Sequence, residues 1–536
     1  MENPVPIPPA RDVAALIAMA DGFAATGDRA RAFGLFDRAT TLAPDYAPAW
    51  TGAGLALAAL GRVGEAFAAL CRARFLDPRL AATRNALGNI LVTRGLLAEA
   101  AGEFAAATEA TPGWWMPWVN LGLVAQHQGR PAAALAPLDH ATALAPAEPE
   151  TWHCLGTALQ LLGRDAEAEA VLRRAIALDP RHLLAHANLG RALRAQNRLD
   201  EAAAAYAAAL AIRPDHAETH WNLAVANFLR GDWAAGWDGA EWRWRVPNFP
   251  ARPRGFAQKL WQGEAAPGKT LLLHAEQGFG DTIMMLRYLP LAAASGARLL
   301  LEVPAELLPV VVPWAAGLGA AVIAAGTPLP PFDLQCPLLS LPRAFATTPD
   351  TVPAAPYLRP APAPASRWAA RLPADGGPPR VVLVWAGRPT HANDTNRSIG
   401  LAGLAPLLAM PGLRFLSLQA GPRAADIAAL GLGPQVEDLA PALADFGDTA
   451  AALARLDLLV SVDTAVLHLA GAIGTRCRAL LPFAPDWRWL PGREDTPWYP
   501  TVRLLRQARP GDWSAPVAAL AAELADLAFP AALAAE

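Results

Sequence analysis

The chain has very little lysine and little cysteine for its length of 536 residues. Its only lysines are Lys259 and Lys269, so any clamp for a phosphate group must use arginine, histidine or backbone N–H groups. The cysteines are scattered with no Cys-x-x-Cys pair, which argues against a zinc site and favours reduced thiols in a cytoplasmic protein. They are Cys71, Cys154, Cys336 and Cys477.

Net charge and long uninterrupted hydrophobic runs are also lacking. A formal net charge of −3 gives no electrostatic reason to expect binding to nucleic acid or to an anionic membrane. The start, Met1–Asp12, has neither the basic nor the apolar region of a signal peptide. The uncharged stretch Leu307–Phe332 is interrupted by prolines and is interpreted as a short helix, a turn, a strand at Ala320–Ala325 and a loop. We therefore expect a cytoplasmic protein without a membrane span.

What the first half does have is a repeat of 34 residues. Glycine and alanine recur with this period, and so does proline, at Pro44, Pro78, Pro112, Pro146, Pro180 and Pro214. A second glycine series, from Gly27 to Gly231, has Asn197 in place of one member. This pattern is the signature of tetratricopeptide repeats, in which small residues let paired helices approach and proline ends the second helix. It predicts an α-solenoid, a tetratricopeptide superhelix, over 13–246, after an N-terminal tail over 1–12.

Three asparagines, Asn120, Asn188 and Asn222, occupy the same position in their repeats. Residues at this position of the first helix normally line the inner face of the superhelix. One interpretation is that the side-chain amides bind the backbone of an extended polypeptide, as in the asparagine ladder that the series resembles, that of the O-GlcNAc transferase superhelix. The other is that the amides only hydrogen-bond neighbouring helices. The sequence leaves both open.

The second half follows a different pattern. Gly231–Arg245 contains four tryptophans and is interpreted as a docking helix, and 247–268 as a linker. From Lys269 onward, short apolar strands alternate with helices, which is typical of α/β folds with parallel sheets; the predicted strands include Thr270–His274, Arg298–Val303 and Val502–Arg506. A segment rich in proline and alanine near Ala361–Pro379 divides this half. We predict two Rossmann-like domains, over 269–375 and 376–536, with ligands at the carboxyl ends of their strands.

The stretch Leu458–Gly474 is the strongest candidate for a binding site. A short apolar run leads directly to Asp463 and Thr464, both good N-cap residues, and then to a predicted helix. A helix N-terminus at the end of a strand offers unpaired N–H groups to a phosphate. His468 lies four residues after Thr464, so on a helix both side chains share a face. The alternative is a plain helix cap with an ordinary buried histidine.

Two other strand-end loops carry polar groups. The first contains Gly278 and Gly280, which would make a tight loop close to a ligand, followed by Asp281, which otherwise reads as a plain N-cap. The second, which includes Gly387, offers Arg388, Arg397 and His391 to a diphosphate or another anion.

Four segments taken together carry a resemblance to a known family. They read HAEQGFGD, WAGRPTHANDTNRSI, SVDTAVLHLAGAIG and PFAPDWRW…PWYPT. In this order they resemble the bacterial tetratricopeptide-linked glycosyltransferases, whose catalytic half is similar to the heptosyltransferase family with a GT-B fold. The chain is also similar to the alphaproteobacterial flagellin glycosyltransferases. The resemblance spans about Val13 to Gln507.

The resemblance implies roles for individual residues. Asp281 would be the catalytic base of the acceptor-side domain, and the segment from Val462 to His468 would bind the donor diphosphate. Ala465 stands where the family has glycine, and Arg397 where it has a lysine that contacts the donor phosphate. The first difference alters the fit slightly, and the second keeps the charge but changes its geometry.

These residues lead to three hypotheses. The first is a glycosyltransferase that moves a sugar from a nucleotide-sugar to Ser or Thr of a protein held by the array, flagellin being the acceptor implied by resemblance and a nonulosonic acid the implied sugar. The second is a glycosyltransferase acting on a lipid or polysaccharide. The third is a scaffold whose transferase half has lost activity. Under the first two, we expect no cofactor and no metal, because a helix N-terminus and basic residues would stabilise the leaving phosphate.

Overall fold

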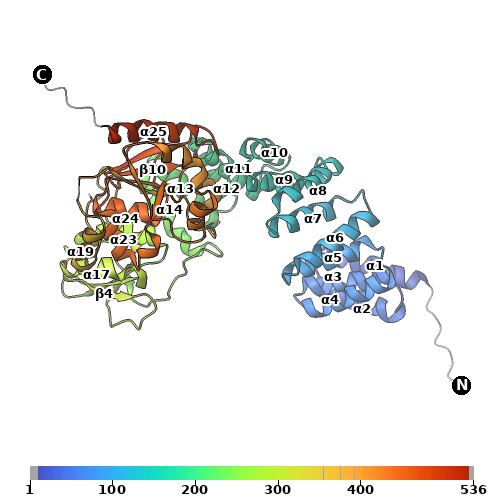
Figure 1. Cartoon of the computed structure of the whole chain (residues 1–536). Coiled ribbons are helices and arrows are strands. Elements are labelled where there is room, and N and C mark those ends of the chain that lie inside the picture. Colours follow the sequence, from blue (N-terminus) through green and yellow to red (C-terminus); the bar gives the residue numbers. More distant parts are fainter. Residues whose placement is uncertain (1–9, 354, 375, 392, 530–536) are drawn as a thin grey trace. The chain divides into compact units, whose positions relative to one another are not determined.

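The computed structural model describes residues 10–353, 355–374, 376–391 and 393–529. The chain forms two compact units. The first comprises Met1–Gln196 with Ala211–Arg213, and the second comprises Asn197–Leu210 with Pro214–Glu536. Each unit has its own internal architecture (Figure 1).

The first unit consists of helix pairs, one pair per 34-residue repeat (Figure 1). Its helices are α1 (Ala10–Ala25), α2 (Arg29–Leu42), α3 (Ala47–Ala59), α4 (Val63–Leu76), α5 (Ala81–Thr93), α6 (Leu97–Ala110), α7 (Trp115–His127), α8 (Pro131–Leu144), α9 (Pro149–Leu161), α10 (Asp165–Leu178) and α11 (Leu183–Ala195). The pattern continues along the chain with α12 (Leu199–Ile212), α13 (Ala217–Arg230) and α14 (Trp233–Ala240). The predicted tetratricopeptide solenoid is confirmed.

Alanine and glycine recur because the paired helices pack closely. The alanines with the 34-residue period have no exposed surface; they are Ala32, Ala66, Ala100, Ala134, Ala168 and Ala202. A Cβ atom added at Gly156 would lie 2.6 Å from Cγ of Leu172, and one at Gly88 would lie 2.5 Å from Cε1 of Phe104. Larger side chains at these positions would push the two helices of a repeat apart.

The turns between paired helices explain the second glycine series. These glycines have φ between 70° and 86°, and Asn197 takes the same place with a φ of 58°. This left-handed region is accessible to glycine and, less readily, to asparagine.

A further repeat position, at which the sequence has a recurring tryptophan interpreted as a packing residue, carries a side-chain N–H donor each time. A ring or guanidinium nitrogen donates to the carbonyl of the proline six residues earlier, over 2.7–3.0 Å. The donors are Trp50, Arg84, Trp118, Trp152, His186 and His220. These side chains therefore fix the turn between repeats.

The second unit contains two parallel sheets. The first has five strands in the order β1-β5-β2-β3-β4. The strands are β1 (Lys259–Leu260), β2 (Thr270–His274), β3 (Arg298–Val303), β4 (Ala321–Ala324) and β5 (Leu334–Pro337). Its helices are α15 (Phe279–Met285), α16 (Leu289–Ala293), α17 (Leu308–Ala316) and α18 (Leu341–Ala344).

The second sheet has six strands in the order β11-β10-β9-β6-β7-β8, all parallel. The strands are β6 (Arg380–Val384), β7 (Arg414–Ser417), β8 (Val436–Asp438), β9 (Leu458–Val462), β10 (Cys477–Leu481) and β11 (Val502–Arg506). Its helices are α19 (Pro362–Arg371), α20 (Asp394–Arg397), α21 (Leu401–Leu404), α22 (Asp426–Ala429), α23 (Phe446–Leu453), α24 (Ala465–Ile473) and α25 (Ser514–Ala528).

Several elements lie where the sequence predicts none. β1 lies inside the segment interpreted as a linker, and β5 and β8 lie in segments for which no strand was predicted. α19 occupies the proline-rich break near Ala361–Pro379, because proline is tolerated in the first turn of a helix. β1 and β8 were missed because two or three residues are too few to show a period.

The tryptophan-rich segment packs within the second unit. Trp233 stacks on Trp498 with ring centroids 5.1 Å apart, and Trp237 meets Trp487 edge-on at 5.5 Å. Both helical tryptophans are almost fully buried. The segment is thus part of the core of this unit, which supports the predicted structural role of these two tryptophans.

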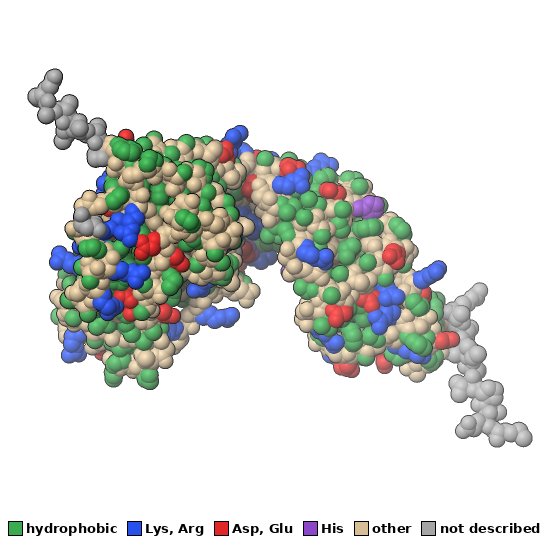
Figure 2. Space-filling view, in the orientation of Figure 1, with side chains coloured by type: hydrophobic (Ala, Val, Ile, Leu, Met, Phe, Trp, Pro, Cys, Tyr) green, Lys and Arg blue, Asp and Glu red, His purple; other side chains and the backbone are tan. Residues whose placement is uncertain are grey.

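The last two features of the fold are the distribution of charged side chains on the surface and the hydrophobic character of the helices. On the face seen in Figure 2, basic and acidic side chains lie intermingled among the described residues. Among the described helices, none combines the length and apolar character needed to cross a membrane.

Candidate functional site

The candidate site lies where the strand order of the six-stranded sheet reverses. β6 leads toward β7 and β8 on one side, and its other neighbour β9 leads toward β10 and β11. Loops at the carboxyl ends of two such adjacent strands diverge and leave a crevice for ligands. The loop after β6 carries Gly387, Arg388 and Arg397, and the turn after β9 carries Asp463 and Thr464.

The turn after β9 leaves the start of α24 open. Thr464 is the N-cap residue, with extended φ and ψ of −140° and 167°, and within the described residues its side chain makes no capping hydrogen bond. Its hydroxyl instead lies 3.1 Å from that of Ser461. Because the first amides of a helix have no intrahelical acceptor, those of Ala465 and Val466 are available to an anion.

His468 is buried and held in one orientation. Its Nδ1 lies 3.0 Å from the Tyr499 hydroxyl, and its ring stacks on Trp489 with centroids 5.5 Å apart. Its Nε2 lies 3.7 Å from Oδ1 of Asp463. The histidine therefore faces the Asp463 carboxylate rather than open solvent.

The Asp463 carboxylate is kept ionised by its surroundings. Burial alone would raise its pKa. The hydrogen bond and charge of His468, together with the Arg397 guanidinium, have the larger effect, so the pKa lies below the ordinary value. The pKa of His391 lies below its ordinary value. Burial is the main cause and the Arg397 guanidinium adds to it, whereas the Asp463 carboxylate acts in the opposite direction. The loop after β6 and the turn after β9 therefore share one electrostatic environment.

Arg397 is placed by its own short helix. Its Nε lies 3.4 Å from Oδ1 of Asp394, which also accepts from the Ser398 hydroxyl at 3.1 Å. A Cβ added at Gly387 would lie 2.4 Å from Nη2 of Arg397, so glycine is needed for the guanidinium to lie against the backbone. Arg388, by contrast, is exposed.

The loop after β2 meets this site through a helix contact. α15 packs against α24, and a Cβ added at Gly280 would lie 2.8 Å from Cδ2 of His468. Gly278 is the N-cap residue of α15 with ordinary extended backbone, and Gly280 lies within the helix. Gly280 therefore serves the contact between helices, and the predicted tight glycine loop is replaced by the start of a helix.

Asp281 is the third residue of α15, not its N-cap, and it forms an ion pair with Arg488. Arg488 also contacts Oδ1 of Asp486 at 2.5 Å and lies over the Trp487 ring at 4.4 Å. Burial lowers the pKa of Arg488 to about 10. Sequence reasoning missed this arginine, although it lies in the segment PDWRW; no local pattern indicates a partner 207 residues away.

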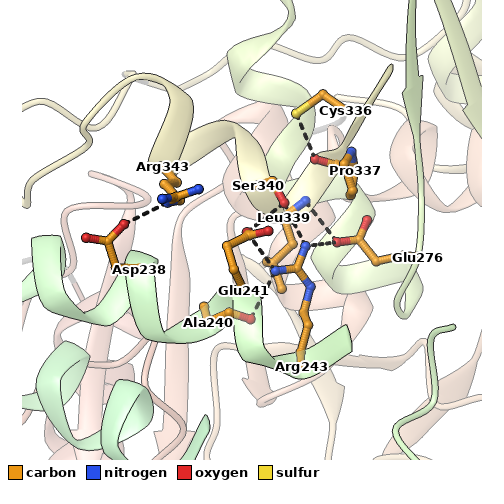
Figure 3. A network of polar contacts seen from close by, with 10 residues as sticks. All are labelled: Asp238, Ala240, Glu241, Arg243, Glu276, Cys336, Pro337, Leu339, Ser340 and Arg343. Carbon is orange, nitrogen blue, oxygen red and sulfur yellow. Dashed lines mark hydrogen bonds and ion pairs between the residues drawn. The ribbon is translucent and has the colours of Figure 1, made fainter. Parts of the chain in front are cut away.

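Glu276, in the loop between β2 and α15, belongs to a separate buried network (Figure 3). Its Oε1 lies 3.1 Å from Nη2 of Arg243 and accepts from the Leu339 amide at 3.2 Å. Arg243 also donates to Ser340 Oγ at 2.7 Å and to Glu241 Oε1 at 2.9 Å. Burial raises the pKa of Glu276 to about 7, although the Arg243 charge opposes this. The network fixes the segment after α14 to the five-stranded sheet.

Two cavities of the second unit lie away from these loops. One of about 610 Å³ is lined by residues at the amino ends of β10 and β11, including Arg476, Arg478 and Arg503. One of about 200 Å³ adjoins Glu241, Ser340 and the buried network. Because ligands of parallel sheets bind at the carboxyl ends of strands, the larger cavity is not the candidate site.

The asparagines of the array have different surroundings. The amide of Asn120 donates to Oδ1 of Asn85 at 2.8 Å. The amide of Asn188 lies 3.0 Å from both His153 Nε2 and Thr157 Oγ1. Within the part of the chain that the structure describes, Asn222 has no hydrogen-bond partner. Two of the three amides therefore link neighbouring repeats, as the second interpretation of the series expects.

Comparison with known proteins agrees with the repeat array. Tetratricopeptide-repeat family models match residues 17–81, 85–149 and 149–192, and a TPR-repeat model matches 190–231. Protein FlbA of Caulobacter vibrioides is 30% identical over 338 residues, which cover 57% of this chain and 56% of that protein. The array therefore consists of tetratricopeptide repeats, and the chain is similar to FlbA over little more than half of that protein's length.

Solved structures similar to the chain include other repeat proteins. YrrB, described as a TPR protein with an unusual peptide-binding site, is 24% identical with a TM-score of 0.30, over 34% of this chain and 95% of that one. PilF of Pseudomonas aeruginosa is 19% identical with a TM-score of 0.36, over 39% of this chain and 94% of that one. TTC0263 of Thermus thermophilus is 23% identical with a TM-score of 0.30, over 34% of this chain and 98% of that one.

Proposed function

We propose that the protein is a glycosyltransferase of GT-B architecture that transfers a sugar from a nucleotide-sugar to a Ser or Thr hydroxyl of a protein acceptor. The observation that carries the proposal is the contact of α15 with α24, where Gly280 lies against His468. It brings the helix of Asp281 next to the turn at Asp463–Thr464. In the family that the sequence resembles, the helix of Asp281 corresponds to the acceptor side of the site, and the turn at Asp463–Thr464 corresponds to the donor side.

The donor phosphates would bind at the start of α24. The open amides of Ala465 and Val466 and the positive end of the helix dipole favour a diphosphate there. Arg397 lies close enough to Asp463 to lower its pKa and supplies the positive charge. Asp463 itself is paired with His468, which reduces its repulsion of the phosphates. As the bond from the sugar to phosphate breaks, these groups would stabilise the charge on the leaving nucleotide.

Asp281 would take the proton from the acceptor hydroxyl as its oxygen attacks the anomeric carbon. In its ion pair with Arg488, one of the two carboxylate oxygens of Asp281 contacts the guanidinium. The pair either opens when the acceptor binds or holds the second oxygen toward the acceptor. In both cases Arg488 would act as a positioning residue for the base.

The repeat array would bind the polypeptide acceptor. Arrays of this kind present an extended inner surface, and a second binding module raises the local concentration of acceptor at the site. Asn222 has an amide with no partner among the described residues, so it is the member of the asparagine series best suited to a peptide backbone. Flagellin is proposed as the acceptor from the resemblance to flagellin glycosyltransferases.

The proposal is tested by calorimetric titration of the full-length protein with nucleotide-sugars. Arg397→Ala should weaken donor binding about 10- to 100-fold, because a charge-assisted hydrogen bond contributes roughly 1.5–3 kcal/mol. Arg423→Ala is the matched control, since Arg423 is exposed and follows β7 of the same sheet. Equal affinities for the wild type and Arg397→Ala would remove Arg397 from the site.

One observation favours a second function, that of a repeat scaffold without catalysis. In the structure, the proposed base is neutralised by Arg488. If the pair is permanent, nucleotide-sugars would still bind but no sugar would be transferred. Calorimetry combined with a transfer assay separates the two functions, because only the first predicts both binding and turnover.

A further inference from the structure

Helix α9 and the start of α11 bring together a glutamate, two histidines and a cysteine in the repeat array. Donor atoms of Glu150, His153 and Cys154 lie within 4.8 Å of one another. His182, the N-cap residue of α11, contacts the same glutamate. We propose that Glu150, His153 and Cys154 form a site for a single divalent zinc ion, with His182 orienting the carboxylate.

Two of the three separations between donor atoms match those of tetrahedral coordination. Sγ of Cys154 lies 3.4 Å from Oε1 of Glu150, and Nδ1 of His153 lies 3.5 Å from the same oxygen. Zinc bonds of about 2.0–2.1 Å to nitrogen and oxygen and about 2.3 Å to sulfur imply separations between ligand atoms of roughly 3.3–3.5 Å. A zinc ion therefore needs no large movement of the helix backbone. Three protein ligands leave the fourth position to water or to another donor.

The imidazole of His153 is the observation that points to a ligand. The side chain is about nine-tenths buried, and its Nδ1 lies 3.5 Å from Oε1 of Glu150 but forms no hydrogen bond with any described residue. A buried polar nitrogen without a partner costs about 1–3 kcal/mol. Coordination of zinc through Nδ1 removes this cost.

The neighbours of the two rings suit this coordination. Nδ1 of His182 accepts from the Ala185 amide at 3.1 Å, so its Nε2–H donates to Oε2 of Glu150 at 3.2 Å. Zinc ligands are commonly held by such hydrogen bonds. The Asn188 amide, 3.0 Å from Nε2 of His153, can rotate by half a turn to present its carbonyl. The histidine then carries its proton on Nε2 and leaves Nδ1 free for the metal.

The cluster is specific to one repeat. Glu150, His153 and Cys154 follow an i, i+3, i+4 pattern, which places them on one face of α9. At the position of Cys154 the other repeats have Ala18, Gly52, Ala86, Asn120, Asn188 and Asn222. No other repeat in the sequence has a cysteine or histidine at the positions of Cys154 and His153. The cysteine count alone argued against zinc, because it considers only pairs of cysteines and not one cysteine with a histidine and a glutamate.

Binding of the metal is coupled to release of a proton. Burial and the neighbouring Glu150 charge raise the pKa of the Cys154 thiol, so the free protein holds a protonated sulfur. Zinc binds the thiolate, so the ion must displace this proton. The bound ion would link the ligands of α9, which His182 and Asn188 connect to the next repeat.

Cobalt provides a direct probe, because thiolate ligation of Co²⁺ produces a charge-transfer absorption band. Full-length protein is stripped of metal with a chelator and titrated with Co²⁺, and then with Zn²⁺. We expect one thiolate-ligated cobalt per chain and loss of the band when zinc displaces it. Cys154→Ser should abolish the band, and His153→Ala should weaken binding at least about 10-fold.

Two further variants keep the result interpretable. Cys71→Ser, at a half-buried cysteine elsewhere in the array, should leave the band and its affinity unchanged. Glu150→Gln, at an exposed residue where folding is least affected, should weaken cobalt binding while circular dichroism stays that of the wild type. Absence of a band in the folded wild type at excess cobalt, or its persistence in Cys154→Ser, would overturn the proposal.

Discussion

Asp281 and Arg488 lie 207 residues apart in the chain and yet form an ion pair beside the candidate donor site. A carboxylate held by arginine is fixed in position, but it accepts a proton only through the oxygen that stays free. The pair therefore decides how this carboxylate would act on an acceptor hydroxyl. Neither the Gly-Asp motif nor the tryptophan-flanked arginine indicates the pairing by itself.

Replacement of the carboxylate tests the proposed base. Asp281→Asn keeps the shape of the side chain and removes its ability to take a proton, so sugar transfer should fall about 10²- to 10⁴-fold. Donor affinity, measured by calorimetry, should change little. Sugar transfer by Asp281→Asn at the wild-type rate would show that Asp281 is not the catalytic base and only pairs with Arg488.

Glu276 provides a prediction on pH and stability. Its pKa in the folded protein, about 7, lies above the ordinary value of 4.5, so the folded state binds more protons than the unfolded state between these two values. Stability should therefore fall as pH rises from about 4.5 to about 7, by roughly 3 kcal/mol from this group. Denaturant unfolding at several pH values should show a smaller decline for Glu276→Gln than for the wild type.

An exposed glutamate serves as the control for that experiment. Glu306→Gln should leave the pH profile of stability unchanged, because Glu306 lies at the surface. Identical profiles for the wild type and Glu276→Gln would mean that Glu276 stays ionised beside Arg243 throughout this range.

Among the secondary-structure elements, α15 and α24 define the proposed catalytic geometry. Gly280→Ala adds a Cβ that would lie 2.8 Å from the His468 ring, and that ring is held by Tyr499 and Trp489. The variant should lose about 1–3 kcal/mol of stability through overpacking and should also lose transfer activity. Thermal unfolding and the transfer assay measure both effects.

A neighbouring glycine controls for the substitution itself. Gly278 has ordinary backbone angles, and the Cβ that Gly278→Ala adds would lie 3.4 Å from Oδ2 of Asp281, its nearest new contact. It should keep wild-type stability within about 0.5 kcal/mol. Equal stability of the two variants would contradict the close contact of α15 with α24.

Elements with clear apolar or repeat patterns were predicted correctly, whereas the strands β1, β5 and β8 were not. The 34-residue period specified the helix pairs because each repeat is a local unit with its own glycine turn. β2, β3 and β11 coincide with the predicted Thr270–His274, Arg298–Val303 and Val502–Arg506. β1 and β8 form only through neighbours far along the chain, so no local signal marks them.

The same distinction applies to the candidate site. Asp463, Thr464 and Arg397 were predicted as binding residues because each follows the end of a strand, and in the structure the Arg397 guanidinium lies close enough to Asp463 to lower its pKa. Gly280 was recognised, but for the wrong physical reason, since it meets His468 instead of forming a tight loop. Arg488 was missed, because its role depends on a contact between segments far apart in sequence.

For the whole molecule, the boundary between the two units determines which shortened chains should fold, and this boundary differs from the end of the repeat pattern. α13 and α14 continue the repeats, but they belong to the second unit, where Trp233 and Trp237 are buried against Trp498 and Trp487. A chain that starts at Asn197 should therefore fold, whereas one that starts at Pro247 should be unstable or insoluble. Loss of one buried tryptophan alone costs about 3–5 kcal/mol.

Thermal unfolding of the two shortened chains checks this prediction. The longer chain should unfold cooperatively and still bind the nucleotide-sugar. Cooperative unfolding of the chain from Pro247, at the same temperature, would show that the tryptophan cluster contributes nothing to this unit.

The central claim is that the protein attaches a sugar to a polypeptide, and intact-protein mass spectrometry tests it most directly. Flagellin is purified from cells with the gene, without it, and with the gene encoding Asp281→Asn. The account predicts that flagellin loses mass in whole sugar units without the gene, that the wild-type gene restores it, and that the Asp281→Asn gene does not. An unchanged flagellin mass in cells that lack the gene would contradict the assignment of flagellin as acceptor, and full restoration by Asp281→Asn would contradict the proposed chemistry.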